Sequence, residues 1–439
     1  MKRFTLLSIL GCMLTALLCL PLTATAKGGY KSVSVGEKHV MVLKEDGTLW
    51  GWGRNLYGEL GDGTTTERTR PVKILDGVRQ VSAGDFCTMS IFDDGTLWGW
   101  GSNGYGELGD GTTTKRNRPI KILDGVKQVS AGGAYTMAIL NDGTLWGWGY
   151  NNCGQLGDGT TTERKRPVKI LDGVKQVSVG GSHTMAILND GTLWGWGYNG
   201  HGQLGDGTTT ERNRPIKILD GVKQVSVGEF YTMAILNDGT LWGWGYNDYG
   251  LLGDGTTTER KRPVKILDGV KQVSVGGSHT MAILNDGTLW GWGYNGHGQL
   301  GDGTTTERNR PIKILDGVKQ VSVGEFYTMA ILNDGTLWGW GYNDYGLLGD
   351  GTTTERKRPV KILDGVKQVS TGTFHTMAIL NDGTLWGWGV NNKGQLGDGS
   401  ITNRNRPIKI AEGVRDVACG NSYTIYITKD GDLMECGEL

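Results

Sequence analysis

The chain has 439 residues, and its 45 lysines and arginines balance its 45 aspartates and glutamates, so the formal net charge is zero. This balance excludes the strongly electropositive face that binding to DNA or RNA requires. Six cysteines are too few for the disulfide framework of an exported protein, and their spacing matches no metal site. We therefore expect no nucleic-acid partner, no metal and no cofactor.

The first 26 residues predict a secretory signal peptide. Residues 1–3 are Met-Lys-Arg, residues 4–22 are mostly apolar, and residues 24–26 read Ala-Thr-Ala, the small-x-small form of a cleavage site. Because the apolar stretch is almost long enough to span a bilayer, an uncleaved anchor is the alternative. We expect an exported protein, secreted or held in the cell envelope, whose residues 27–439 form a single repeat domain without further membrane contact.

Beyond this leader, the motif WGWG returns every 48 residues. A fixed period of this length indicates stacked modules that each rely on their neighbours, so we count one domain rather than several. All 16 tryptophans of the chain belong to these motifs: Trp50, Trp52, Trp98, Trp100, Trp146, Trp148, Trp194, Trp196, Trp242, Trp244, Trp290, Trp292, Trp338, Trp340, Trp386 and Trp388.

One module, residues 175–222, indicates what each repeat builds. Four short apolar or alternating segments are separated by turn signals, which is typical of a four-stranded antiparallel meander. Residues 189–191, Asn-Asp-Gly, mark the hairpin between the second and third strands. Pro215 precedes the fourth segment and favours an edge position for it, because proline donates no backbone hydrogen bond.

Trp194 and Trp196 lie two residues apart, so in a strand they point to the same face, while Gly195 and Gly197 leave the other face nearly bare. Such a sheet can stack on a copy of itself. Radially repeated four-stranded sheets are the blades of a β-propeller. The sequence therefore predicts an all-β propeller of about eight to nine four-stranded antiparallel blades, with the tryptophans as structural residues between blades rather than as a ligand cage.

The motifs VxxGxxHT and WGxNxxGQLG, followed by a proline-led strand, resemble the regulator of chromosome condensation repeat family. In one module the matching positions are Gly180, His183, Thr184, Trp196, Gly197, Asn199, Gly202, Gln203, Leu204 and Gly205. The resemblance covers about residues 31–438 and implies a β-propeller, usually with seven blades. Here VxxG begins nine times and the proline-led strand occurs eight times. Eight full blades with three extra strands, or nine blades with one strand missing, both fit.

The same resemblance implies guanine-nucleotide exchange on a small GTPase, and chromatin contact. The exchange residues of the family are not part of the repeat consensus, so none can be placed on this sequence. The leader and the zero net charge argue against both roles, unless the protein is delivered into a host cell. A closer functional analogy is with exported bacterial members of the family, which bind and inhibit β-lactamases through an aromatic loop face.

Two stretches differ between otherwise near-identical modules. The first follows VxxG, for example residues 181–183 and 229–231, and the second surrounds the asparagine of WGWGxN. In an up-and-down meander both stretches emerge at one end, and the nearly constant NDG and ILDG turns emerge at the other. Aromatic residues with adaptable polar neighbours are typical of recognition surfaces. Drift at tolerant loop positions is the alternative explanation.

The candidate binding face consists of the aromatic, histidine and lysine residues at these variable positions. They are Tyr57, Phe86, Tyr105, Tyr135, His183, His201, Phe230, Tyr231, Tyr249, His279, His297, Phe326, Tyr327, Tyr345, Phe374, His375 and Lys393.

Catalytic and metal-binding patterns do not stand out from the repeat. The histidines occur one per module and would spread around a ring, whereas a metal needs ligands that converge. The stretch LGDGTTTER lacks the features of a phosphate or calcium loop and predicts a solvated turn. We expect no enzymatic activity and favour an exported binding module for a protein partner. A carbohydrate-binding propeller and an exchange-factor-like effector are the alternatives.

Overall fold

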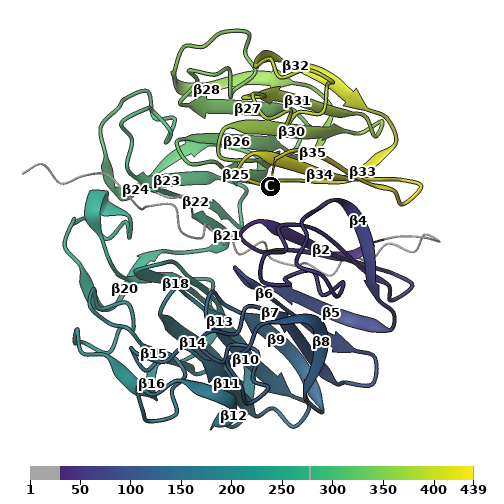
Figure 1. Cartoon of the computed structure of the whole chain (residues 1–439). Coiled ribbons are helices and arrows are strands. Elements are labelled where there is room, and N and C mark those ends of the chain that lie inside the picture. Colours follow the sequence, from purple (N-terminus) through teal and green to yellow (C-terminus); the bar gives the residue numbers. More distant parts are fainter. Residues whose placement is uncertain (1–29, 276–277, 439) are drawn as a thin grey trace, which may run out of the picture.

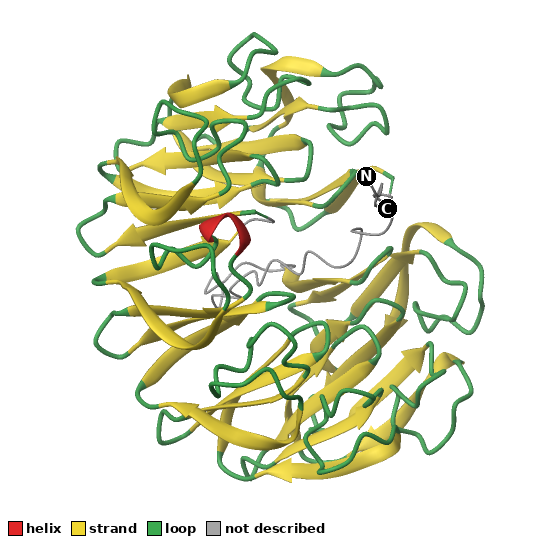
Figure 2. Cartoon of the chain, turned by 90° about the vertical axis from the view of Figure 1, so that its left-hand side faces the viewer, coloured by secondary structure: helices red, strands yellow, loops and turns green. Residues whose placement is uncertain are grey.

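The computed structural model describes residues 30–275 and 278–438, and the predicted signal peptide lies outside these ranges. The described chain forms 35 β-strands and one short helix, η1 (Asp248–Gly250). The strands make nine antiparallel sheets, numbered here 1 to 9 in chain order, that follow one another around a ring (Figure 1). Figure 2 shows strands throughout the molecule, with η1 as the helical segment. The predicted all-β propeller is confirmed.

Sheets 1 to 8 each contain four strands paired in chain order, and sheet 9 contains three. Of the two arrangements that the sequence left open, the described residues therefore form nine blades, the last without a fourth strand. The fourth strands lie at the periphery of the ring (Figure 1), as the position of the prolines predicts.

Strands in equivalent positions have equivalent bounds. The first strands are β1 (Tyr30–Val35), β5 (Val78–Ala83), β9 (Val126–Ala131), β13 (Val174–Val179), β17 (Val222–Val227), β21 (Val270–Val275), β25 (Val318–Val323), β29 (Val366–Thr371) and β33 (Val414–Cys419). The second strands are β2 (His39–Lys44), β6 (Cys87–Phe92), β10 (Tyr135–Leu140), β14 (His183–Leu188), β18 (Tyr231–Leu236), β22 (His279–Leu284), β26 (Tyr327–Leu332), β30 (His375–Leu380) and β34 (Tyr423–Thr428).

The third strands of sheets 1 to 8 carry the WGWG motif, and the fourth strands begin with an arginine. The third strands are β3 (Leu49–Gly53), β7 (Leu97–Gly101), β11 (Leu145–Gly149), β15 (Leu193–Gly197), β19 (Leu241–Gly245), β23 (Leu289–Gly293), β27 (Leu337–Gly341), β31 (Leu385–Gly389) and β35 (Leu433–Gly437). The fourth strands are β4 (Arg68–Leu75), β8 (Arg116–Leu123), β12 (Arg164–Leu171), β16 (Arg212–Leu219), β20 (Arg260–Leu267), β24 (Arg308–Leu315), β28 (Arg356–Leu363) and β32 (Arg404–Ala411).

Strand register places small residues beside the tryptophans. In sheet 4, Thr184 lies opposite Trp196 and Ala186 lies opposite Trp194, which leaves room for the indoles on that face. On the other face Gly195 lies opposite Met185, whose sulfur would come within 2.8 Å of a Cβ atom at position 195. The methionine therefore fills the space that the glycine leaves, and a larger residue at position 195 would collide with it.

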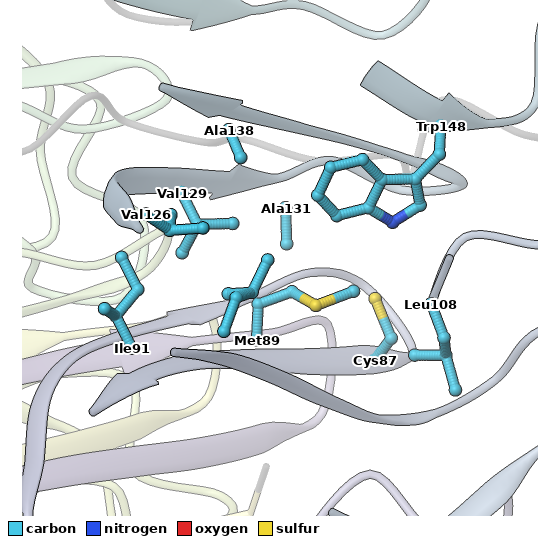
Figure 3. Packing of buried hydrophobic residues seen from close by; sticks show 10 residues of the cluster. Cys87, Met89, Ile91, Leu108, Val126, Val129, Ala131, Ala138 and Trp148 are labelled. Carbon is cyan, nitrogen blue, oxygen red and sulfur yellow. The ribbon is translucent and has the colours of Figure 1, made fainter. Parts of the chain in front are cut away.

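Neighbouring sheets pack face to face across apolar seams (Figure 3). The seam between sheets 2 and 3 contains Cys87, Met89, Ile91 and Leu97 from one sheet with Leu108 from its long connection, and Val126, Val129, Ala131, Ala138 and Trp148 from the next sheet. A fully buried tryptophan of this kind contributes much of the apolar area of a seam.

The two tryptophans of a pair have different surroundings. Trp148 is fully buried, and its Nε1 donates a hydrogen bond of 2.9 Å to the carbonyl oxygen of Glu107 in the preceding module. Trp146 is half-buried in the same seam as Trp148, and its Nε1 donates to the hydroxyl of Thr144 in its own hairpin. The second tryptophan therefore joins two modules by a hydrogen bond, and the first stays within its own turn.

Sheet 9 meets sheet 1 across a seam that lacks these hydrogen bonds. Val40, Val42 and Trp52 of sheet 1 pack against Ile425 and Ile427 of sheet 9. Sheet 9 has neither a fourth strand nor the connecting loop in the described residues, and the buried Nε1 of Trp52 has no hydrogen-bond partner there.

Three further features mark this closing seam. Val40 occupies the position at which the other eight modules have threonine. Glu435 of β35 lies opposite Ile425, at the position where the other modules have the first glycine of WGWG. Burial raises the pKa of Glu435 to about 7. A cavity of about 100 Å³ lies beside the seam, lined by Val42, Trp52 and Leu433 among others.

Candidate functional site

The end of the propeller that carries the first-to-second and third-to-fourth connections is called the loop face here, and the end that carries the NDG turns is called the turn face. The chain order of the strands places both variable stretches on the loop face, as expected. Ring contacts between them, such as the one of 5.0 Å between His201 and Phe230, show that the two connections lie side by side.

A buried asparagine organises each long connection on the loop face. In module 4, Asn199 is fully buried, and its Nδ2 donates to Asp206 and to the carbonyl oxygens of Thr208 and Thr210, at 3.0–3.1 Å. Its Oδ1 accepts a hydrogen bond of 3.0 Å from the backbone N–H of Leu204. The side chain therefore satisfies the backbone of a loop that has no strand partner.

An ion pair completes the same loop. The Nε atom of Arg212 donates to Asp206 at 2.7 Å. Burial raises the pKa of Asp206, but hydrogen bonds from Thr208 and Arg212 lower it more, so that it lies below its usual range. The stretch LGDGTTTER forms a turn whose residues 209–211 are exposed, as expected. The loop is also ordered, because Asp206 and Thr208 in it are bonded to the asparagine.

Five candidate residues lie in the seams instead of on the loop face. They are Tyr135, His183, His279, Tyr327 and His375, each at most 2% exposed. The Nε2 atoms of His279 and His375 lie 3.1 and 2.9 Å from threonine hydroxyls of the next sheet, and the hydroxyl of Tyr327 donates to the carbonyl oxygen of His375. A ligand on the loop face cannot reach these rings, so they are removed from the candidate face.

Burial also fixes the protonation state of these groups. It lowers the pKa of His183 and His279 to about 3 and that of His375 to about 4, and it raises the pKa of Tyr135 and Tyr327. They are therefore neutral at physiological pH, as buried seam residues must be. Tyr231 is partly buried and packs into the seam between sheets 5 and 6, so it is a seam residue as well.

Two aromatic clusters occupy the loop face over the boundaries between sheets 4 and 5 and between sheets 6 and 7. The 4/5 cluster contains Tyr198, His201, Phe230 and Tyr246, with ring centroids 5.0–6.5 Å apart. The 6/7 cluster contains Tyr294, His297, Phe326 and Tyr342, with ring centroids 5.0–6.4 Å apart. Edge-to-face contacts at these distances stabilise aromatic groups beyond the area that they bury.

Each cluster contains a histidine beside a glutamate. The Nδ1 of His201 lies 2.6 Å from Glu259, and that of His297 lies 2.6 Å from Glu355. The four tyrosines that precede the asparagines, Tyr198, Tyr246, Tyr294 and Tyr342, were not among the predicted residues. Their position, one residue beyond the WGWG strand and inside the variable stretch, was the signal that would have found them.

Further rings extend the 6/7 cluster on both sides. Tyr249 contacts Tyr294 at 5.3 Å, Tyr342 contacts Tyr345 at 6.4 Å, and Tyr345 contacts Phe374 at 6.3 Å. The rings from Tyr249 to Phe374 therefore form one connected belt. Tyr249 and Tyr345 are 50% and 45% exposed, which leaves their rings available to a partner. A hollow of about 260 Å³ lies at the end of the belt, lined by Tyr345, Phe374, Val390, Asn392 and Asn403.

The remaining candidate residues also lie on the loop face. Tyr57 contacts Phe86 at 5.8 Å, and Tyr105 contacts Tyr150 at 5.0 Å. Lys393 is exposed and forms an ion pair of 2.5 Å with Glu438.

Two other features, a metal site and a membrane-spanning helix, were looked for among the described residues. No group of three or more histidine, cysteine, aspartate or glutamate side chains could hold a metal ion among the residues that the structure describes. No helix in residues 30–275 and 278–438 is long and apolar enough to cross a membrane.

The nine stacked sheets define the class of this protein as a repeat β-propeller. The RCC1-like domain model matches residues 16–316. Two models of the Regulator of chromosome condensation (RCC1) repeat match residues 334–379 and 382–427, and residues 318–347 and 366–395. The chain therefore belongs to the RCC1-like domain family, which confirms the resemblance seen in its motifs.

Solved structures with the same fold include two proteins from human and yeast. Human WBSCR16 is 24% identical, over 78% of this chain and 98% of its own, with a TM-score of 0.51. Prp20p from Saccharomyces cerevisiae is 20% identical, over 93% of both chains, with a TM-score of 0.53. At these identities the likeness extends to the fold.

Proposed function

We propose that this protein is an exported, non-catalytic binding module that recognises another protein through the aromatic belt of its loop face. The observation that carries the proposal is the connected run of partly exposed rings from Tyr249 to Phe374. Exposed aromatic side chains present a large contact area at low conformational cost, and they are enriched at the energetic centres of protein interfaces.

The relatives support a protein partner. The yeast structures describe binding properties of Prp20p to Gsp1p and histones, and Kap60 bound to yeast RCC1 (Prp20). Export rests on the leader of residues 1–26, whose composition is that of a signal peptide. A carbohydrate ligand is the second candidate, because exposed tyrosine rings also suit the apolar faces of sugars.

The test uses the chain from residue 27 onward, immobilised and exposed to exported proteins and, separately, to a glycan array. A captured protein is then compared with a variant in which Tyr249, Tyr294 and Tyr345, all rings of the belt, are replaced by alanine. Loss of these rings should weaken binding at least about tenfold, or 1.4 kcal/mol. Tyr231 is left intact, because its replacement would disturb a seam.

The matched control changes the turn face. Lysine in place of Asn237 and Asn333, both exposed in NDG turns, adds charge without removing the aspartates that cap these turns. This variant should bind like the unaltered protein. Binding that survives the aromatic triple change, or that the turn-face change abolishes, would refute the assignment. Binding to glycans alone would favour the carbohydrate function.

A further inference from the structure

The loop face already contains one aromatic cluster that is filled by the protein's own cations. In the 1/2 cluster, formed by Arg54, Tyr57 and Phe86, the guanidinium of Arg54 lies 4.7 Å from the ring centroid of Phe86 and 5.2 Å from that of Tyr57. The Nζ of Lys115 lies 6.0 Å from the Tyr57 ring, and Arg54 also pairs with Glu37 at 3.3 Å. Both cations are within the range of a cation–π interaction.

The repeat makes this cluster comparable with the other two, position by position. Three and five modules further along, the phenylalanine is kept as Phe230 and Phe326. The arginine is replaced by Tyr198 and Tyr294.

At the position of the second cation, the charge of the side chain is reversed in the later clusters. The position of Lys115 is occupied by Glu259 and Glu355 in the two later clusters. The phenylalanine is thus retained, while both internal cations are lost and a glutamate replaces one of them.

Carboxylates surround the 4/5 cluster. Glu229 is exposed beside Phe230, Asp248 accepts a hydrogen bond of 2.7 Å from the hydroxyl of Tyr246, and Glu259 lies against His201. Within the described ranges, none of these three carboxylates forms an ion pair with a lysine or an arginine. A ring face flanked by such carboxylates attracts a cation from outside.

The 6/7 cluster repeats the arrangement with Glu325, Asp344 and Glu355. Asp344 accepts a hydrogen bond of 3.0 Å from Tyr342, and burial raises the pKa of Glu325. Residues 156–274 and 252–370 have identical sequences, so the two clusters are chemically equivalent copies.

We infer that the 4/5 and 6/7 clusters each bind an arginine side chain of the protein partner. The guanidinium stacks on the rings of the cluster, and the flanking carboxylates accept its N–H groups. Arginine fits better than lysine because its planar guanidinium stacks on a ring while it donates hydrogen bonds from its edge. This inference rests on the proposed function and specifies the chemistry of the partner.

Two equivalent sites on one rigid face favour a partner that presents two arginines. Binding of the first arginine turns the second event into an intramolecular one, so a divalent ligand of suitable spacing binds more tightly than either arginine alone.

The first test uses labelled glycine–serine peptides with two arginines at a series of spacings, and fluorescence anisotropy as the readout. The matched peptides carry citrulline, which has nearly the same shape as arginine but no charge. At the best spacing the arginine peptide should bind at least about tenfold more tightly than its citrulline counterpart, which corresponds to 1.4 kcal/mol. Equal binding of the two peptides, or no binding of either, overturns the inference.

The second test fills the sites with the protein's own cations. Y198R with E259K, and Y294R with E355K, place in the two clusters the cations that the 1/2 cluster has at the equivalent positions. Peptide binding should be lost while the melting temperature stays unchanged. Phe86→Leu is the control and should leave peptide binding intact, because Arg54 already covers that ring. Unchanged binding in the cation-filled variant overturns the inference.

The two proposals fail in different ways. If a protein partner loses affinity for the aromatic triple variant but binds the cation-filled variant normally, arginine recognition is refuted. The proposed binding function is then unaffected. If a partner binds the aromatic triple variant as tightly as it binds the unaltered protein, the proposed function itself is refuted.

Discussion

Replacing tryptophan by phenylalanine should have different effects in an internal seam and in the closing seam. Trp244 is fully buried, and its Nε1 donates a hydrogen bond of 2.9 Å to the carbonyl oxygen of Gln203. Trp52 is equally buried at 1% exposure, but its Nε1 has no partner in the described residues. The two substitutions remove the same atoms from similar apolar surroundings, so the loss of packing largely cancels between them.

The difference lies in the indole N–H. Trp244→Phe removes a buried hydrogen bond that stabilises the fold by about 1 kcal/mol. It leaves no orphaned acceptor, because Thr232 still donates to the same carbonyl. Trp52→Phe removes an unpaired buried donor, and the relief from its desolvation offsets about 1–3 kcal/mol of the lost packing. We expect Trp244→Phe to be the more destabilising by about 2–4 kcal/mol.

Urea unfolding followed by circular dichroism measures both variants against the unaltered protein. The comparison is valid if the slope of the free energy of unfolding against urea is the same in all three proteins. Equal losses of stability in the two variants would show that the indole N–H of Trp52 is satisfied, and would refute this account of the closing seam.

Three further outcomes are expected. Trp244→Ala should reduce the free energy of unfolding by about 3–5 kcal/mol, and Trp242→Ala by less, because this indole is half-buried and its Nε1 binds Thr240 in its own hairpin; thermal unfolding would contradict this if the order were reversed. Asn199→Ala leaves three backbone groups of a loop without their partner and should cost about 2–4 kcal/mol, measured as a lower urea midpoint, whereas no change would mean that water replaces the side chain. The pKa of Glu435 rises from 4.5 to about 7, so the folded state binds more protons between these values and the free energy of unfolding falls as pH rises through that window. Glu435→Gln should remove this slope, and a slope that persists would assign it to another group.

Much of the module could be predicted from its sequence because the signals are local. The period of two in WGWG fixes which residues share a face, the NDG turn sets the hairpin, and Pro215 marks an edge strand. These interactions span a few residues and do not depend on neighbouring modules. Strand order, the antiparallel pairing and the common end of the two variable stretches followed from them.

The sequence could not show which variable positions reach the surface. His183 and His201 lie in the two variable stretches of one module, yet the first is fully buried and the second lies in an aromatic cluster. The reason is that β14 (His183–Leu188) already begins at His183, so its ring points into the seam toward the next sheet. The direction of a side chain at a strand end depends on where the neighbouring sheet lies.

Tertiary structure also decided the make-up of the aromatic clusters and of the ring closure. Tyr198 and Phe230 come from different modules and meet only because adjacent sheets bring their loops together. In the closing seam, Val40 takes the place of a threonine whose hydroxyl would have no carbonyl to bind, a relation that no single module reveals. The local pattern thus determined each sheet, and the packing of one sheet on the next determined what the sheets expose, because contacts across a seam join residues about one module apart in the chain.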